Sequence, residues 1–220
     1  MLKGYKYRLY PNKEQQIYFA KCFGCVRFIY NRMLSDKIEY YKETKQKLNN
    51  TPAKYKKEFP WLKEVDSLAL ANAQMNLQAA YNNFFTKPET GFPNFKSKKN
   101  HHYSYTTNNV NGNFKVTDKY ITLPKIGLVK VKKHRDFEGI IKSVTVSKNP
   151  SGKYYVSVLV DCEEQEKLSK SENEIGIDLG IKEFAITSDG EMIENSKYLR
   201  KSEKKLRKLQ KRFISLSKRK

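Results

Sequence analysis

Residues 140–161, IIKSVTVSKNPSGKYYVSVLVD, contain two β-type runs, 140–148 and 153–161, separated by an Asn-Pro-Ser-Gly turn. The second run alternates, and its larger apolar side chains share one face: Tyr154, Val156, Val158 and Val160. Four more short runs of this type precede the pair, at 103–107, 114–117, 120–123 and 126–131. Many short strands at such spacing predict a small β-barrel.

The N-terminal residues 3–10 also alternate, with Tyr5, Tyr7 and Leu9 on one face, and predict an isolated strand that ends at Pro11. We expect this strand to close the barrel. It is separated from the other strands by a long stretch of helical periodicity. The helices are therefore expected to be an insertion in the barrel.

The first helical segment begins at Asn12, which forms a capping-box pattern with Gln15, and continues at helical spacing up to Gly24. A second 3.6-residue period runs from Val26 to Tyr41. Two helices that meet at a glycine predict a helix-turn-helix. Residues 42–60 are Lys-rich and polar, and a third helix is expected from Leu68 through Phe84, capped by Asp66 or Ser67.

The chain is therefore expected to be of the α+β class and multidomain. The expected parts are a first barrel strand, a helical insertion, the β-barrel, a polar linker and a C-terminal part: 1–10, 11–95, 96–162, 163–173 and 174–220.

The C-terminal part opens with residues 174–193, EIGIDLGIKEFAITSDGEMI, which predict a strand, a second strand at 183–187, an Asp189-Gly190 hairpin turn and a third strand. Alternation places Ile175, Ile177 and Leu179 toward a core and Asp178 on the opposite face. Because glycines flank this carboxylate at 176 and 180, a phosphate or a metal could approach it closely.

Asp178 is thus a candidate ligand for Mg²⁺ in two-metal phosphodiester hydrolysis, since hard cations prefer carboxylate oxygen. One ligand cannot hold two metals. The alternatives are a buried or hairpin-capping Asp without a catalytic role, and the similar GIDLG that opens nucleotide-binding actin-like folds. Ile181 and Lys182 follow here in place of small hydroxylated residues, which disfavours the last alternative.

The charge balance indicates a polyanionic partner. Lys and Arg number 44 against 23 Asp and Glu, which gives a formal net charge of +21 and a pI near 9.7. Such an excess favours nucleic acid over small acidic substrates. The start, MLKGYKYRLY, lacks a signal-peptide apolar region, and no apolar run approaches membrane-spanning length, so we expect a soluble, intracellular protein without membrane partners.

Three cysteines do not make a disulfide framework in a chain of 220 residues. Cys22 and Cys25 have zinc-knuckle spacing, but a tetrahedral site needs four ligands, and no second CxxC follows. Buried helix cysteines are therefore preferred to a zinc site.

Residues 92–107, FPNFKSKKNHHYSYTT, combine cations for phosphate contacts with rings on which bases could stack. The candidate nucleic-acid-binding residues of this segment are Lys96, Lys98, Lys99, Tyr103 and Tyr105. The alternatives are a solvated loop for the cations and barrel core for the two tyrosines.

A basic helix is predicted over the last 22 residues, 199–220, which carry 11 Lys or Arg and one Glu. It could follow a nucleic-acid backbone through Lys204, Arg207, Lys208 and Lys211, or it could be simply solvated.

Taken in order, these segments make the chain resemble the TnpB (OrfB) family of insertion-sequence proteins, which is related to type V CRISPR effector nucleases. The resemblance is carried by KYRLYPNKEQ with RFIYNRML, then WLKEVDSLALANAQMNLQAAYNNFF, GFPNFKSKK, LPKIGLVKV, YYVSVLV and GIDLGIKEFAITSDG. Together these pieces cover almost the whole chain.

The resemblance implies a wedge barrel split around a helical recognition insertion, followed by a RuvC-type domain of RNase H-like fold. It implies a guide RNA from the transposon end and double-stranded target DNA, cut by an Asp, a Glu and a second Asp with Mg²⁺. Asp178 matches the first Asp, and positions that read the target-adjacent motif match Ser67, Ala71 and Thr106. Ala71 lacks a polar side chain, so the motif is expected to differ.

By the same resemblance, the other two carboxylates and the four-cysteine zinc ribbon fall beyond residue 220. We therefore expect a truncated, monomeric protein of the prokaryotic cytoplasm, associated with the nucleoid when bound to DNA. It would bind RNA and DNA without cleaving. The alternative is a stand-alone helix-turn-helix regulator that binds DNA with neither guide nor catalysis.

Overall fold

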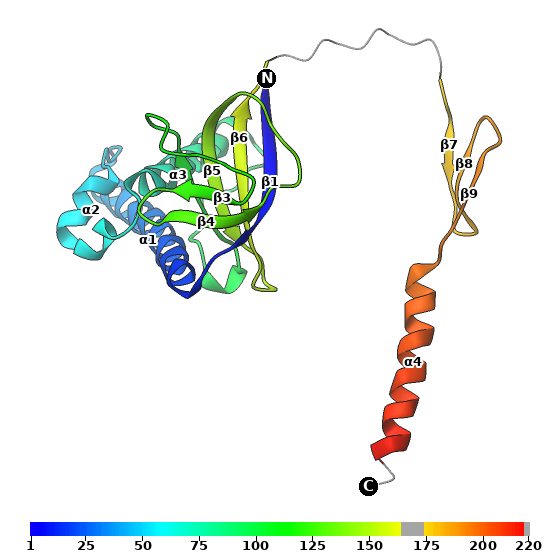
Figure 1. Ribbon diagram of the computed structural model, residues 1–220. Coiled ribbons are helices and arrows are strands. Elements are labelled where there is room, and N and C mark those ends of the chain that lie inside the picture. Colours follow the sequence, from blue (N-terminus) through cyan, green and yellow to red (C-terminus); the bar gives the residue numbers. More distant parts are fainter. Residues whose placement is uncertain (164–173, 218–220) are drawn as a thin grey trace. The chain divides into compact units, whose positions relative to one another are not determined.

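The computed structural model describes residues 1–163 and 174–217 and divides into two compact units, Met1–Gln165 and Glu166–Lys220 (Figure 1). The expected linker, 163–173, lies outside the described residues except for Glu163. No helix in the described ranges has both the length and the apolar character needed to cross a membrane.

The first unit is built on one six-stranded antiparallel sheet with the order β2-β5-β6-β1-β4-β3. The strands are β1 (Leu2–Tyr10), β2 (Tyr103–Asn108), β3 (Tyr120–Leu123), β4 (Gly127–Lys132), β5 (Ile140–Lys148) and β6 (Tyr154–Asp161). The expected barrel is thus a curled, open sheet, since β2 and β3 are its edges (Figure 1). β1 does not close it but lies in the middle, because its two edges pair with β6 and β4.

The strand expected at 114–117 is wrong. Only one isolated bridge, Val116 to Ile121, forms there. The reason is a tight turn directly after it, in which Thr117 N–H donates to the Tyr120 carbonyl at 2.8 Å, so too few residues are left to pair.

The helices lie in the chain between β1 and β2, as expected for an insertion. They are α1 (Lys13–Thr44), α2 (Pro52–Glu58), the 3-10 turn η1 (Pro60–Lys63), α3 (Ser67–Thr86) and the 3-10 turn η2 (Lys98–Asn100). The capping box at the start of α1 is confirmed: Gln15 N–H donates to Asn12 Oδ1 at 2.8 Å, and Asn12 N–H donates to Gln15 Oε1 at 3.1 Å.

The polar segment 42–60 contains α2, which was not predicted from the sequence. Tyr55 anchors this helix in the core, since its side chain is only 1% exposed.

The turn predicted at Gly24 is also wrong, because α1 continues through it as one 32-residue helix. A glycine inside a helix costs only about 1 kcal/mol relative to alanine. Cys22, Phe23, Cys25 and Val26 are all buried beside it, and burying each large side chain contributes roughly 1.5–3 kcal/mol. Packing on both sides therefore outweighs the local break.

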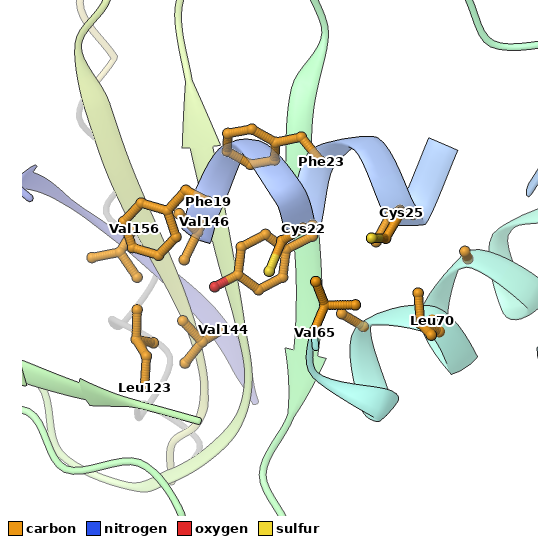
Figure 2. Close-up of a cluster of buried hydrophobic side chains, with 14 of the residues drawn as sticks. Phe19, Cys22, Phe23, Cys25, Val65, Leu70, Leu123, Val144, Val146 and Val156 are labelled. Carbon is orange, nitrogen blue, oxygen red and sulfur yellow. The ribbon is translucent and has the colours of Figure 1, made fainter. Parts of the chain in front are cut away.

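One hydrophobic core joins the helices to the sheet (Figure 2). Phe19 is fully buried, and its ring lies 5.8 Å from the ring of Tyr154 on β6 and 6.3 Å from that of Tyr105 on β2, centroid to centroid. The alternation predicted in β6 is confirmed, since its four large inward residues are buried. The core thus fixes α1 against the concave row of side chains from β2, β5 and β6.

The second unit contains a three-stranded antiparallel sheet, order β7-β8-β9, and one helix. The elements are β7 (Ile177–Leu179), β8 (Glu183–Thr187), β9 (Met192–Glu194) and α4 (Tyr198–Ser217). The three strands and the basic helix agree with the prediction. The predicted core under β7 does not, because Ile175, Ile177 and Leu179 are 57%, 61% and 71% exposed, with nothing in the described ranges covering them.

Candidate nucleic-acid interface

Asp178 lies in the middle of β7, exposed, directly opposite Ile186 of β8, which in turn pairs with Met192 of β9. Residues opposite one another in adjacent strands project from the same face. The carboxylate therefore shares its face with two apolar side chains.

The described residues do not by themselves make a metal site. Within 1–163 and 174–217, no group of three or more His, Cys, Asp or Glu is arranged to hold an ion. A Mg²⁺ ion prefers six oxygen ligands in near-octahedral geometry, so the single Asp178 carboxylate does not fit it alone. Any such ion would need carboxylates that these residues do not supply.

The glycines around Asp178 have structural roles of their own. A Cβ on Gly180 would lie 3.0 Å from the Glu183 carbonyl, so a side chain is disfavoured by the chain's own turn. Gly176 N–H donates to Ser188 Oγ at 3.1 Å, which ties the two strands together. The two glycines are therefore explained by the geometry of the hairpin itself, and they do not by themselves indicate that a ligand approaches Asp178.

In the basic connector, Lys96 is attached to α1. The Asn31 side chain accepts from Lys96 N–H at 2.8 Å and donates to its carbonyl at 2.9 Å. The Lys96 ammonium lies 4.1 Å from the centroid of the buried Tyr30 ring, and desolvation lowers the pKa of this lysine. All three lysines are exposed, and Lys96 differs from Lys98 and Lys99 in η2 by its contacts with Asn31 and Tyr30.

The two tyrosines of β2 differ in how deeply they are buried. Tyr105 is 3% exposed and packs on Phe19 and Phe23, so its assignment as a base-stacking residue is wrong and its alternative as core is correct. Burial raises the pKa of its hydroxyl well above the usual value. Tyr103, at the start of the strand, is only partly buried and remains a candidate.

The motif-reading candidates sit at the junction of α3 and β2. Asp66 accepts from Leu68 N–H and, through its other oxygen, from the buried Thr107 hydroxyl. Ser67 and Thr106 are the neighbours of these two anchoring residues. Ser67 Oγ accepts from Lys56 Nζ at 2.7 Å, and the Thr106 hydroxyl hydrogen-bonds that of Thr145 across the sheet at 2.8 Å.

The basic candidates of α4 occupy one side of an amphipathic helix. Helical spacing places Lys204, Arg207, Lys208 and Lys211 on one face and Leu206, Leu209 and Phe213 on the other. These three apolar side chains are 55%, 53% and 74% exposed. The helix thus has a basic face and an apolar face.

A cationic aromatic row on β1 and β6 was missed from the sequence. The Arg8 guanidinium lies 5.1 Å from the Tyr155 ring centroid and 5.4 Å from that of Tyr10, and Lys6 Nζ lies 4.9 Å from Tyr155. In the alternating strand 3–10, these cations lie on the face opposite the core residues. This alternation is the sequence pattern from which the row could have been predicted.

A hollow of about 280 Å³ was also missed, between α1 and one end of the sheet. Its lining combines cations and aromatic rings: Ala20, Phe23, Gly24, Arg27, Lys98, Tyr103, Lys148 and Tyr154. Only Lys98 and Tyr103 were candidates from the sequence, because the other residues come from segments far apart in the chain.

Cys22 and Cys25 are buried in α1, 0% and 5% exposed, which confirms them as buried helix cysteines (Figure 2). Desolvation, the largest cause in each case, raises the pKa of the Cys22 thiol to about 12 and that of Cys25 to about 11. Thiolates, which metals require, are thereby disfavoured.

These raised pKa values predict a loss of stability at alkaline pH. The folded state keeps two protons that the unfolded chain releases near pH 9, so this contribution is complete below pH 9 and is lost toward about 12. The urea midpoint should fall less between pH 8 and pH 10.5 in the double variant Cys22→Ala/Cys25→Ala than in the parent. Cys162→Ala is the control; an identical fall in all three proteins would contradict the prediction.

Comparison with known proteins gives two family matches. Residues 1–46 match the OrfB_IS605 "Helix-turn-helix domain", a range that here holds β1 and α1, and residues 157–220 match the OrfB_IS605 "Probable transposase". These matches place the chain among the proteins encoded by insertion sequences. It belongs to the TnpB (OrfB) family.

Similarity to individual curated proteins agrees with this family assignment. The chain is 30% identical over 213 residues to "Putative RNA-guided DNA endonuclease InsQ" of Escherichia coli, and 31% identical over 217 residues to a "Putative RNA-guided DNA endonuclease" of Streptomyces pristinaespiralis. Each alignment covers 93% of this chain and 52% of the relative, so the chain spans about half the length of these relatives. It is also 36% identical over 115 residues to "Virulence protein VsdF" of Salmonella dublin, covering 44% of this chain and 95% of that protein.

Among solved structures, "Cryo-EM structure of the Cas12f1-sgRNA-target DNA complex" aligns over 98% of this chain and 63% of that chain. The sequence identity is 14% and the TM-score is 0.38, a similarity too low to establish a common fold.

Proposed function

We propose that the chain binds a guide RNA and double-stranded target DNA as a part of an RNA-guided DNA endonuclease. The observation that carries the proposal is the match of 93% of the chain to two relatives named as RNA-guided DNA endonucleases. The formal charge of +21 supports it, because a compact chain with this excess is stabilised by a polyanion. On this proposal the protein works as a monomer on nucleic acid in the prokaryotic cytoplasm.

Asp178 is proposed as the first metal-binding carboxylate of a RuvC-type, RNase H-like domain. The exposed position in the middle of β7 and the antiparallel order β7-β8-β9 are compatible with this role. Since two-metal hydrolysis needs several carboxylates, a polypeptide of these 220 residues is expected to bind without cleaving. In the endonuclease, bound Mg²⁺ would stabilise the attacking and leaving oxygens of the phosphodiester.

The test is a gel-shift series with the 220-residue polypeptide, an RNA transcribed from the end of its own transposon, and a duplex DNA that matches the guide segment. Tight RNA binding, and duplex binding that appears only with the RNA, are expected. Incubation with Mg²⁺ should leave the duplex intact, and Asp178→Ala should change neither binding step. Weak RNA binding, or cleavage by this polypeptide, would contradict the proposal.

The second candidate function is a regulator that binds duplex DNA by itself, and the helix-turn-helix description of residues 1–46 favours it. It predicts tight, sequence-specific duplex binding with no added RNA. The continuous helix α1 gives this candidate less support than the sequence did, because the expected turn at Gly24 is missing. The arm of the same gel-shift series without RNA separates the two functions.

A further inference from the structure

The hollow beside α1 is built from a row of residues that face one another across three strands. Tyr103 of β2 is in register with Lys148 of β5, which is in register with Tyr154 of β6. Side chains in such a row project from the same face, here the face that α1 covers. Lys148 Nζ lies 5.4 Å from the Tyr154 ring centroid, and the Phe23 ring of α1 lies 6.1 Å from that of Tyr103.

Within residues 1–163 and 174–217, the cations of this hollow have no acidic partner. No salt bridge to Arg27, Lys98 or Lys148 occurs within the described ranges, although seven ion pairs form elsewhere in the same unit. Three cations around one hollow of about 280 Å³ repel each other unless an anion enters. This volume lies just below the range for small-molecule pockets, roughly 300–1,000 Å³, and so fits one small group.

Gly24 gives an independent indication of a ligand. It lies in the middle of α1, where glycine is unfavourable, yet a Cβ at this position would meet no atom within 4 Å. Packing within the chain therefore does not require a glycine here. A group from outside the chain that approaches the helix surface between Phe23 and Arg27 would require it.

We propose that this hollow binds a single unpaired nucleotide of the RNA, with the base against the Tyr103 ring and the phosphate held by Arg27 and Lys148. Base stacking on an aromatic ring and phosphate contacts from flanking cations are the two components by which proteins hold unpaired nucleotides. The inference rests on the proposed RNA binding and specifies where one nucleotide is held.

The first test fills the hollow. Gly24→Leu should keep or raise the thermal midpoint, because leucine is a better helix former and the space is open, yet weaken binding of a 15-nucleotide single-stranded RNA about 10-fold. Asn76→Leu, at an exposed position of α3 outside the hollow, should change neither quantity. Unaltered RNA affinity in a folded Gly24→Leu protein would overturn the proposal.

The second test locates the nucleotide. The same RNA with 4-thiouridine should crosslink to Tyr103, and the double variant Arg27→Gln/Lys148→Gln should lose this crosslink. The double variant keeps the proposal testable in case Gly24→Leu does not fold. Stronger crosslinking of the DNA oligonucleotide of the same sequence would overturn the assignment to RNA. A parent protein that does not bind RNA contradicts the proposed function itself, whereas binding without a Tyr103 crosslink contradicts this site alone.

Discussion

Replacing Asp66 by alanine is expected to lower the free energy of unfolding of the Met1–Gln165 unit by about 2–4 kcal/mol. The carboxylate has two separate tasks. One oxygen accepts from Leu68 N–H at 3.1 Å and caps α3, and the other accepts from the Thr107 hydroxyl on β2. Asp66 is 7% exposed and Thr107 is 0% exposed, so water cannot replace either contact.

The size of the effect follows from these two losses. Removing an N-cap costs typically about 1 kcal/mol. A buried hydroxyl left without an acceptor costs roughly another 1–3 kcal/mol. The same contact joins the helical insertion to the sheet, so its loss should also loosen the positions of Ser67 and Thr106.

Urea unfolding followed by circular dichroism measures this prediction. Asp66→Asn keeps an oxygen acceptor for one of the two contacts and should cost less than Asp66→Ala. Thr107→Val removes the donor, and the double variant Asp66→Ala/Thr107→Val should cost less than the sum of the single changes, because the two residues are coupled. Strict additivity would show that the hydrogen bond between them contributes little.

Raising the salt concentration from about 50 to about 200 mM is expected to weaken RNA binding by the 220-residue polypeptide about 300-fold. For single strands, log K falls with log salt at a slope of about −0.7 per phosphate contact, so roughly six contacts give a slope near −4. The excess of 44 Lys and Arg over 23 Asp and Glu makes this number of contacts reasonable.

The slope also measures whether α4 takes part. The triple variant Lys204→Ala/Lys208→Ala/Lys211→Ala should reduce the slope by about 2, since each lost phosphate contact contributes about 0.7. Lys42→Ala/Lys47→Ala/Lys87→Ala removes the same charge from three other exposed positions and is the matched control. Equal slopes for both triple variants would mean that the basic face of α4 acts only through net charge.

Several features follow from short-range pattern and were predicted from the sequence. The alternation of residues 154–160 correctly predicted the buried face of β6. Asn12, Gln15 and Asp66 correctly predicted where α1 and α3 begin, because side chains one to three positions apart satisfy the first N–H groups of a helix. The charge excess and the glycine-flanked Asp178 likewise need no tertiary structure to be recognised.

Tertiary structure alone decided the rest. Gly24 lies inside α1 and not at a turn, because Phe19 and Phe23 contact strand residues more than 75 positions along the chain. The helix is also buried on both sides of the glycine, at Phe23 and at Cys25. β1 lies within the sheet and not at a closing edge, since strand order depends on pairings between distant segments. For the same reason, the sequence determined that cations and rings exist in this protein, but only the register of Tyr103, Lys148 and Tyr154 beneath α1 brought them around one hollow.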